Sequence, residues 1–178
     1  ASELKEKIAV VTGGTRGIGF SIAAALLDEG AKVFICGRDA ANLKTAVANF
    51  TQKSKDRVDG LAADVRHYDD CRKVIRGAVE RFGGLDIVVQ NAGIYPWSLI
   101  ENTEPEEWDV VMAVNLKGTY LIARAALPHM RSKRYGRMIF TSSITGPRVT
   151  SPGHGHYSAS KAGINGFIKA AALEFSSY

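Results

Sequence analysis

A glycine-rich turn between an apolar run and a helical pattern is the feature that most constrains the fold. The apolar run Ile8–Thr12 predicts a strand, and Ile22–Glu29 has the apolar spacing of a helix that is closed by Gly30. Between them, Gly13–Gly19 carries glycine at four positions. Glycines at a strand-to-helix turn permit a tight bend, close approach of the backbone to a pyrophosphate and close packing of helix on sheet. The pattern therefore predicts a dinucleotide site with its phosphates at the helix N-terminus.

Strand and helix patterns alternate along the rest of the chain. Further strands are predicted at Lys32–Cys36, Val58–Ala63, Leu85–Val89 and Arg137–Thr141, and helices at Leu43–Phe50, Asp69–Phe82, Leu116–Met130 and Tyr157–Phe175. This order predicts an α/β fold, a parallel sheet with right-handed crossovers and helices on both faces. At 178 residues, 46% of them hydrophobic, the chain is long enough for one cored domain, which we assign to residues 1–178.

A shorter helix is expected before Leu116. Thr103 and Glu106 form a capping-box pattern at its start. The residues of this segment expected in the core are Trp108, Val111 and Met112. Asn115 falls inside the helical region, where its amide competes with the backbone for hydrogen bonds. Such an unusual residue can mark a functional site.

The charge distribution does not indicate a nucleic-acid or membrane partner. The formal net charge is +5, and the densest basic run, Arg131–Arg137, follows a helical pattern, where cations complement the helix dipole and Gly136 suits the exit. No aromatic residues alternate with basic ones as in nucleic-acid motifs. The segment Ala1–Lys7 is charged where a signal peptide would be apolar, and no later run approaches the ~18 apolar residues of a membrane span. We expect a cytoplasmic protein.

The cysteines and histidines do not suggest a metal site. Cys36 and Cys71 are far apart and lack metal-ligand spacing, so we expect free, buried thiols. His154 and His156 lie in a loop without a neighbouring cysteine or cluster of carboxylates. We expect them to act in a substrate loop or on the surface, and we expect no metal.

The tip of the second predicted strand bears on the choice of dinucleotide. A carboxylate there binds the 2′-hydroxyl of NAD, whereas a basic residue accommodates the 2′-phosphate of NADP. Gly37 occupies the acidic position and Arg38 follows it, while Arg16 adds a second cation from the glycine turn. These cations favour NADP(H). Asp39 leaves NAD(H) open, because a shift of one residue would bring its carboxylate to the ribose.

Polar residues follow the later strands, at the edge where parallel sheets bind ligands. Asp64-Val65 follow the third strand, and Asp64 would either face the ligand or cap the next helix. Asn91-Ala92-Gly93 follow the fourth, where Asn91 offers donors and acceptors and Gly93 lets the backbone come close. The aromatic loop Ile94–Ser98 either lines a substrate pocket or covers the end of the sheet. Ser142-Ser143 follow the fifth strand.

Tyr157 and Lys161 stand four residues apart at the start of the last predicted helix. At this spacing their side chains lie on the same helical face. A free tyrosine titrates near pH ~10, and a fixed cation nearby favours the phenolate. The pair can therefore act as an acid/base unit.

Together these motifs resemble the short-chain dehydrogenase/reductase family along the whole chain. The matching motifs are Thr12–Gly19, Asp64-Val65, Asn91–Gly93, Asn115, Ser143 and Tyr157-x-x-x-Lys161. The resemblance implies a Rossmann-type, doubly wound sheet in three α/β/α layers. It also implies that cofactor is bound by Gly13, Thr15, Arg16, Gly17, Ile18, Gly19, Arg38, Asp64, Val65, Asn91, Ala92, Gly93, Tyr157 and Lys161.

The resemblance also implies a reaction. Tyr157 would give a proton to a carbonyl in reduction or take one from an alcohol in oxidation, and Lys161 would lower the phenol's pKa and bind the nicotinamide ribose. Ser143, which aligns better than Ser142, would hold the substrate oxygen, and Asn115 would position a water in the proton relay. Asp64 would contact adenine. The implied enzyme is an NADP(H)-dependent oxidoreductase like 3-oxoacyl-carrier-protein reductases, and a homotetramer or homodimer.

Two departures from the family leave alternatives open. Gln90 stands where relatives often have a second asparagine, and Phe175–Tyr178 ends the chain where the family continues into two more strands and a substrate-covering loop. We therefore expect a fold truncated after the fifth strand and the following helix, belonging to a longer chain. The alternatives are an NAD-linked alcohol or sugar dehydrogenase, a dinucleotide-binding protein without catalysis, or an inactive fragment.

Overall fold

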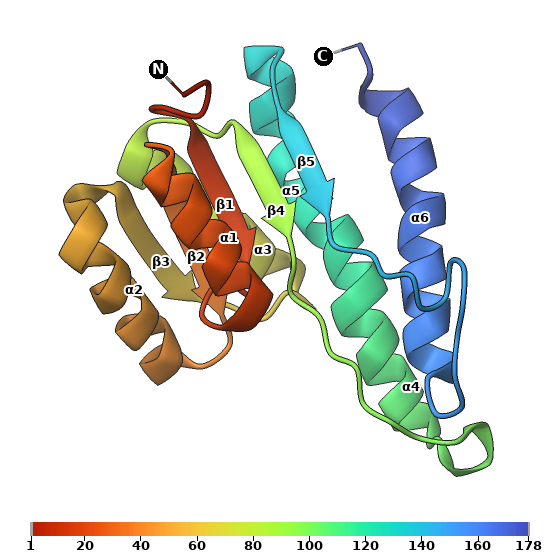
Figure 1. Ribbon diagram of the computed structural model, residues 1–178. Helices are drawn as coiled ribbons and strands as arrows, with labels where there is room; N and C mark the ends of the chain where they lie inside the picture. Colours follow the sequence, from red (N-terminus) through yellow and green to blue (C-terminus); the bar gives the residue numbers. More distant parts are fainter. Residues whose placement is uncertain (1, 178) are drawn as a thin grey trace.

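The computed structural model describes residues 2–177 and contains one five-stranded parallel sheet (Figure 1). Ala1 and Tyr178, which belong to the predicted charged N-terminal segment and to the chain's last residues, lie outside the described part. The strands are β1 (Ile8–Thr12), β2 (Lys32–Gly37), β3 (Val58–Ala62), β4 (Ile87–Gln90) and β5 (Arg137–Phe140). Their order in the sheet is β3-β2-β1-β4-β5. The order reverses between β1 and β4, and ligands bind at the carboxyl ends of the strands flanking such a reversal.

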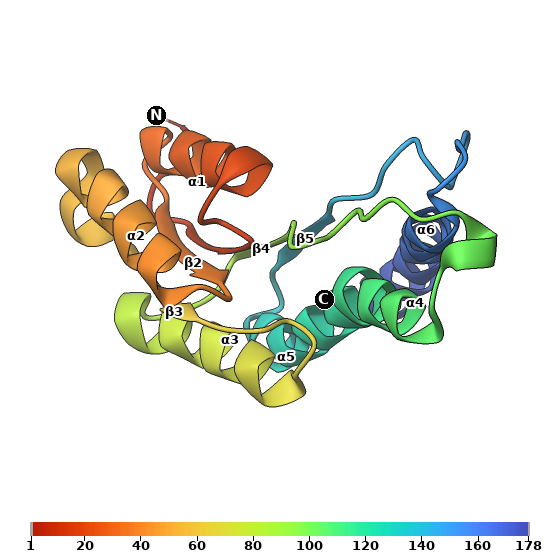
Figure 2. The same cartoon turned by 90° about the horizontal axis from the view of Figure 1, so that it is seen from below.

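Helices cover both faces of this sheet, which confirms the predicted three-layer α/β fold. They are α1 (Gly17–Asp28), α2 (Ala40–Ser54), α3 (Tyr68–Phe82), α4 (Pro105–Met112), α5 (Gly118–Lys133) and α6 (Gly155–Phe175). Figure 2 shows α1 and α2 on one side of the sheet, α3 and α5 on the other, and α4 and α6 beyond β5. The largest shift from the predicted bounds is at α1, which begins at Gly17 instead of Ile22.

Two apolar cores follow from the alternation of side chains along the strands. Ala9 and Val11 of β1 point into the core beneath α1 and α2, whereas Val10 between them faces the core beneath α3 and α5. A parallel strand buried on both faces is a continuous apolar run, as Ile8–Thr12 is. Cys36 and Cys71 lie in the second core as free thiols, which confirms the prediction.

The segment before α5 starts differently from the prediction. α4 begins at Pro105, whose fixed φ suits the first turn, and Glu104 is its N-cap without a side-chain hydrogen bond. The Thr103 hydroxyl donates instead to the carbonyl of Leu99 at 2.9 Å, so the predicted capping box is wrong. Trp108 is 41% exposed, so its predicted place in the core is also wrong. Val111 is buried and Met112 half-buried.

α4 and α5 form one continuous helical rod from Pro105 to Lys133, joined by a π-helical turn at Ala113–Lys117. By length and composition alone this rod qualifies as a candidate membrane span, which the sequence analysis did not expect. Its most apolar window is 56% buried inside the protein. This burial, with packing of α5 on α3, is typical of a core helix. The rod ends at Arg134, in the left-handed region at φ 52°, before the expected exit at Gly136.

Asp86 ties the amino-terminal ends of two strands to the end of α5. Its carboxylate is 5% exposed; Oδ2 accepts from the backbone N–H of Ile8 at 2.9 Å and Oδ1 binds Nζ of Lys133 at 2.5 Å. Burial alone would raise the pKa of this carboxyl. The hydrogen bonds from Lys133 and Ile8 outweigh burial and hold the pKa below its ordinary value.

Replacing Asp86 with alanine is expected to lower the free energy of unfolding by about 2–3 kcal/mol, because the N–H of Ile8 loses its buried acceptor. The native pKa lies below the unfolded one, so this contribution is present above pH ~4 and is lost as pH falls through the native pKa. Chemical denaturation at neutral and acid pH measures both effects. Asp69→Ala, at a carboxylate 75% exposed, is the control. A loss of stability independent of pH would contradict the role assigned to the carboxylate.

Candidate functional site

The glycine turn packs tightly against the end of β4. Gly13 has φ +65°, and a Cβ there would lie 3.0 Å from Cα of Ala92. A Cβ at Gly19 would overlap the carbonyl oxygen of Gly13 and lie 2.6 Å from Nδ2 of Asn91. Because α1 begins inside the turn, its first N–H groups come from the turn itself, and the N-cap Arg16 provides no side-chain cap. Such free N–H groups at the start of a helix fit a phosphate.

The tip of β2 carries the residues on which the choice of dinucleotide is expected to depend. A Cβ at Gly37 would lie 2.7 Å from Cγ2 of Thr15, so the close contact with the glycine turn leaves little room for a carboxylate side chain at this position. Asp39 caps α2, where its Oδ1 accepts from the N–H of Asn42 at 2.7 Å. Arg16 and Arg38 are both exposed. One oxygen of the Asp39 carboxylate is thus engaged in the cap of α2, whereas the guanidinium groups of Arg16 and Arg38 are exposed.

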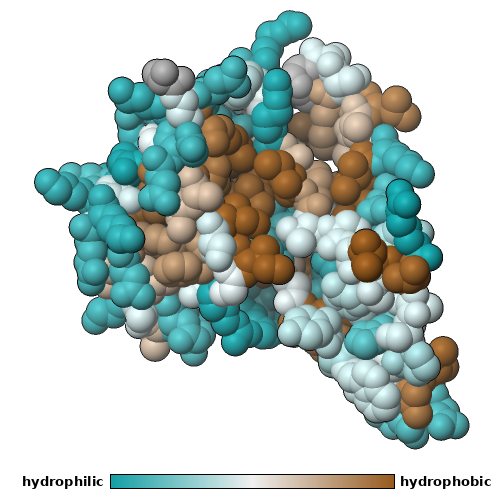
Figure 3. Space-filling view, viewed as in Figure 1, coloured by the Kyte–Doolittle hydropathy of each residue, from teal (hydrophilic) through white to brown (hydrophobic). Residues whose placement is uncertain are grey.

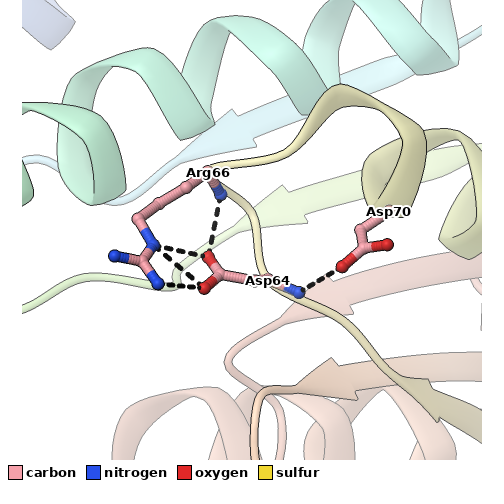
Figure 4. Close-up of polar contacts among 3 residues, drawn as sticks. All are labelled: Asp64, Arg66 and Asp70. Atoms are coloured by element: carbon pink, nitrogen blue, oxygen red, sulfur yellow. Dashed lines mark hydrogen bonds and ion pairs between the residues drawn. The ribbon is translucent and has the colours of Figure 1, made fainter.

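Asp64 is held by an arginine that the sequence analysis did not single out. Its carboxylate accepts from Nε and Nη2 of Arg66, with the shortest contact 2.6 Å, and from the backbone N–H of Arg66 at 3.0 Å (Figure 4). Burial would raise the pKa of Asp64, but these bonds hold it below its ordinary value. The N-cap of α3 is His67, so the alternative that Asp64 caps this helix is wrong. The backbone N–H of Asp64 donates to Oδ2 of Asp70 at 3.1 Å.

Polar side chains join the carboxyl ends of β1, β4 and β5. The Thr12 hydroxyl donates to Oε1 of Gln90 at 2.5 Å and accepts from the backbone N–H groups of Asn91 and Ala92, each at 3.1 Å. Nε2 of Gln90 donates to the carbonyl of Ala92 at 3.2 Å. The Thr141 hydroxyl donates to Oδ1 of Asn91 at 3.5 Å. Gln90, where relatives often have asparagine, therefore has a structural role, because its side chain fixes the backbone that follows β4.

Lys161 is buried beneath the tyrosine, with 4% of its surface exposed. Its Nζ donates to the carbonyl oxygen of Thr141 at 2.7 Å and lies 5.7 Å from the centroid of the Tyr157 ring. Burial lowers the pKa of Lys161 below its ordinary value. A Cβ at Gly93 would lie 3.8 Å from this Nζ, so the amine also faces the end of β4.

Asn115 sits in the π-helical turn and is 1% exposed. Oδ1 accepts from the N–H of Ile94 and Nδ2 donates to the carbonyl of Ile94, both at 2.9 Å, and Nδ2 also donates to Oγ of Ser160 at 3.0 Å. π turns occur often at functional sites. This turn explains how the helix accommodates the asparagine, and a Cβ at Gly93 would lie 3.3 Å from its Oδ1. Asn115 and Lys161 thus flank the same glycine.

The two serines after β5 differ in their free hydrogen-bonding capacity. Ser142 Oγ donates to the carbonyl of Lys161 at 3.3 Å. Ser143 Oγ accepts from the N–H of Thr145 at 3.0 Å, which leaves its proton available for another acceptor. This difference agrees with the preference for Ser143 as the residue that faces a ligand.

Aromatic rings frame Tyr157. The rings of Tyr95 and His154 meet it edge-on, with centroids 6.3 and 6.2 Å away. The two loops that carry these rings are joined, because the N–H of Ser98 donates to the carbonyl of Gly153 at 3.0 Å. Tyr95 is nevertheless 76% exposed. The ring contact places the aromatic loop Ile94–Ser98 against Tyr157.

His156 contradicts the expectation of a surface or substrate-loop role, since it is 1% exposed and packed beneath α4. Within residues 2–177 no group of three or more histidine, cysteine or acidic side chains is placed to hold a metal. Burial raises the pKa of both Cys36 and Cys71 to about 12, so neither thiol is a ready nucleophile.

Apolar surface also gathers away from these residues. A groove of about 320 Å³ lies between α5, β5 and α6 (Figure 3). Its lining includes Met130, Phe140, Ile168 and Phe175, and none of the predicted site residues.

A sequence model of the family described as short chain dehydrogenase matches residues 7–178. The chain therefore belongs to the short-chain dehydrogenase family. It is an oxidoreductase with the family's nicotinamide dinucleotide site, and the glycines above, whose places a Cβ would fill, fit that cofactor.

The similar proteins are longer than this chain. An uncharacterized oxidoreductase of Staphylococcus aureus is 43% identical over 162 residues, which cover 91% of this chain and 68% of that protein. One from Staphylococcus saprophyticus is 37% identical and is covered over 69% of its length. A crystal structure from Sinorhizobium meliloti, provisionally assigned as a short-chain alcohol dehydrogenase, superposes with TM-score 0.91 at 37% identity, covering 97% of this chain and 68% of that one.

The structure adds residues that the sequence analysis missed. Thr141 accepts from Lys161, and Ser160 links Asn115 to Tyr157. Thr141 could have been noticed from its place at the end of a strand, whereas nothing local distinguishes Ser160 from another serine on a helix. Arg66 and Glu107 gave no signal in the sequence, because exposed helices and turns carry many such charges.

Proposed function

We propose that the protein is an NADP(H)-dependent oxidoreductase that interconverts a carbonyl and a secondary alcohol, with Tyr157 as acid/base. The observation that carries the proposal is the buried amine of Lys161, 5.7 Å from the Tyr157 ring centroid and flanking Gly93 together with Asn115. Family membership supports an enzyme acting on CH–OH groups.

Each residue contributes a defined step. When bound, the nicotinamide ring supplies or accepts the hydride. Tyr157 gives its phenolic proton to the substrate oxygen, or takes one from it, so that no free alkoxide accumulates. The Ser143 hydroxyl donates to the same oxygen, where charge develops. The ammonium of Lys161 stabilises the Tyr157 phenolate. Asn115 positions a water in the proton relay.

The cofactor preference rests on the tip of β2. The contact of Gly37 with Thr15 and the helix cap made by Asp39 both disfavour a carboxylate on the ribose. Arg16 and Arg38 are exposed and provide two cations for a 2′-phosphate. Asp64 is the proposed adenine contact, and Arg66 would have to share its carboxylate with the adenine amine. The rival proposal is an NAD-linked alcohol or sugar dehydrogenase.

A substrate screen tests the function. The full-length protein is assayed by loss of NADPH absorbance with acetoacetyl thioesters, aryl ketones, aliphatic ketones and ketoses, and again with NADH. We expect thioesters or ketones to be reduced, because the exposed ring of Tyr95 meets the Tyr157 ring edge-on and offers an apolar contact to a substrate. We expect NADPH to be preferred at least about 10-fold at low cofactor concentration. NADPH binding without turnover of any compound would favour a dinucleotide-binding protein without catalysis.

We propose a homodimer or homotetramer that uses α5 and α6, supported by the exposed apolar side chains Tyr120 on α5 and Leu173 on α6, 43% and 81% exposed. We also propose a cytoplasmic location, with small molecules as ligands and neither nucleic acid nor membrane as a partner.

A further inference from the structure

His156 precedes Tyr157 in the first turn of α6, and its side chain has no exposed surface. Both ring nitrogens contact a partner. Nδ1 lies 2.8 Å from the backbone nitrogen of Tyr157, and Nε2 lies 3.2 Å from Oε1 of Glu107. Glu107 belongs to α4, so the ring joins that helix to the start of α6.

These contacts determine the tautomer. The backbone N–H of Tyr157 can only donate, so Nδ1 must carry the lone pair and the ring proton must be on Nε2. From Nε2 the proton is donated to the carboxylate of Glu107. The carboxylate, which is 33% exposed, therefore orients the ring, and the ring in turn accepts from the N–H of Tyr157.

The N–H of Tyr157 would otherwise lack a partner in the helix. Tyr157 is the third residue of α6, and the first four N–H groups of a helix have no intrahelical acceptor. The N-cap residue His154 makes no side-chain cap. His156 thus supplies, from inside the first turn, the acceptor that a capping residue would otherwise provide.

The carbonyl of Tyr157 is tied to the same rod. It accepts from Oγ of Ser160 at 2.7 Å, and that Oγ accepts from Nδ2 of Asn115 at 3.0 Å. Both connections therefore start from the rod Pro105–Lys133, one at Glu107 and one at Asn115. The backbone on each side of the Tyr157 Cα is fixed against one rigid element.

We propose that Glu107 and His156 are positioning residues that hold Tyr157 over Lys161 through the tyrosine's backbone N–H. The proposal rests on the proposed function, in which Tyr157 moves the proton. A displacement of a catalytic group by about 1 Å can lower the rate about 10²-fold. Tyr157 is held through both its N–H and its carbonyl, so the loss of one of these two contacts should lower the rate by a smaller factor. We expect kcat to fall while cofactor affinity stays unchanged, because neither residue belongs to the dinucleotide site.

The histidine is tested with a destructive and a conservative variant. His156→Leu removes both contacts and is expected to lower kcat about 10-fold, with KM for NADPH changed less than about 2-fold. In His156→Asn the side-chain oxygen can take the place of Nδ1, and kcat should recover to within about 3-fold of wild type. Wild-type kcat in His156→Leu, or equal kcat in the two variants, would overturn the proposal.

The glutamate provides an independent pair, which decides the question if His156→Leu does not fold. Glu107→Leu leaves Nε2–H without an acceptor and is expected to lower kcat about 5-fold, whereas Glu107→Gln keeps an oxygen and should recover most of it. Glu106→Leu, at the exposed neighbouring glutamate on α4, is the control. A loss in Glu106→Leu as large as that in Glu107→Leu would overturn the assignment.

A measurement without turnover separates this proposal from the proposed function. The chain has six tyrosines, so labelling tyrosine with ¹⁵N gives a small set of backbone amide signals in the intact protein. The amide of Tyr157 should exchange with solvent at least about 10-fold faster in His156→Leu, and near the wild-type rate in His156→Asn. If wild type has no activity but exchange follows this order, the proposed function fails and the anchoring stands. Unchanged exchange in His156→Leu would refute the anchoring.

Discussion

Replacing Tyr157 with phenylalanine is expected to lower kcat/KM by about 10³-fold, within the range that general acid–base catalysis contributes. The substitution removes one hydroxyl and leaves the ring, so the edge contacts with Tyr95 and His154 and the burial of Lys161 persist. Affinity for NADPH should therefore change by less than about 3-fold. Single-turnover kinetics with NADPH and fluorescence titration of the cofactor measure the two quantities separately.

The control for this substitution is Tyr135→Phe. Tyr135 lies between the rod and β5, at the amino-terminal ends of the strands, whereas the candidate site lies at their carboxyl ends. Nζ of Lys7 lies 4.3 Å from the centroid of the Tyr135 ring. Loss of that hydroxyl should leave turnover unchanged. If Tyr157→Phe retained more than about a tenth of wild-type activity, a different group would have to move the proton, and the proposed mechanism would be wrong.

The strands, and the polar residues at their carboxyl ends that form the candidate site, could be located because they depend on local patterns. A buried parallel strand is an apolar run, and its carboxyl end is marked by glycine or polar residues, as at Thr12, Asp64 and Asn91. The start of α1 was misjudged because glycine is usually a helix breaker. Here the glycines permit contacts with β4 that a Cβ would prevent, so the helix begins among them.

Contacts between distant residues could not be predicted from the sequence. Lys161 reaches Thr141 and Asn115 reaches Ser160 only because β5, the rod and α6 lie side by side. Nothing local distinguishes Ser160 from any other serine on a helix. The same limit applies to His156. Its place in a segment rich in glycine and proline predicted a loop on the surface, whereas the structure buries its side chain beneath α4.

Local rules also failed where two of them competed. Thr103 and Glu106 satisfied the capping-box spacing, but Pro105 between them fixes the first turn and lacks an N–H. Asp64 was weighed as a ligand contact or as a helix cap. It does not cap α3, because Arg66 two residues later presents a planar fork that matches its carboxylate. Whether a carboxylate pairs with a guanidinium two residues away depends on the backbone conformation of the turn between them, which the sequence does not reveal.

Replacing Arg38 with alanine is expected to weaken NADPH binding roughly 10- to 100-fold, because a guanidinium on a phosphate forms charge-assisted hydrogen bonds. NADH lacks the 2′-phosphate, and its dissociation constant should change by less than about 3-fold. Titration of both dinucleotides into wild type and variant gives the ratio of the two losses. Lys53→Ala removes an equal charge in the last turn of α2, away from the tip of β2, and should affect neither cofactor.

The ratio matters more than either loss, because it separates recognition of the phosphate from a general effect of charge. A smaller loss for NADPH at high salt would agree with an exposed ionic contact, since salt screens exposed charges. Equal losses for the two dinucleotides would remove Arg38 from the phosphate site. In that case Asp39 becomes the alternative ribose contact, and it would have to leave its cap on Asn42 to reach the hydroxyls.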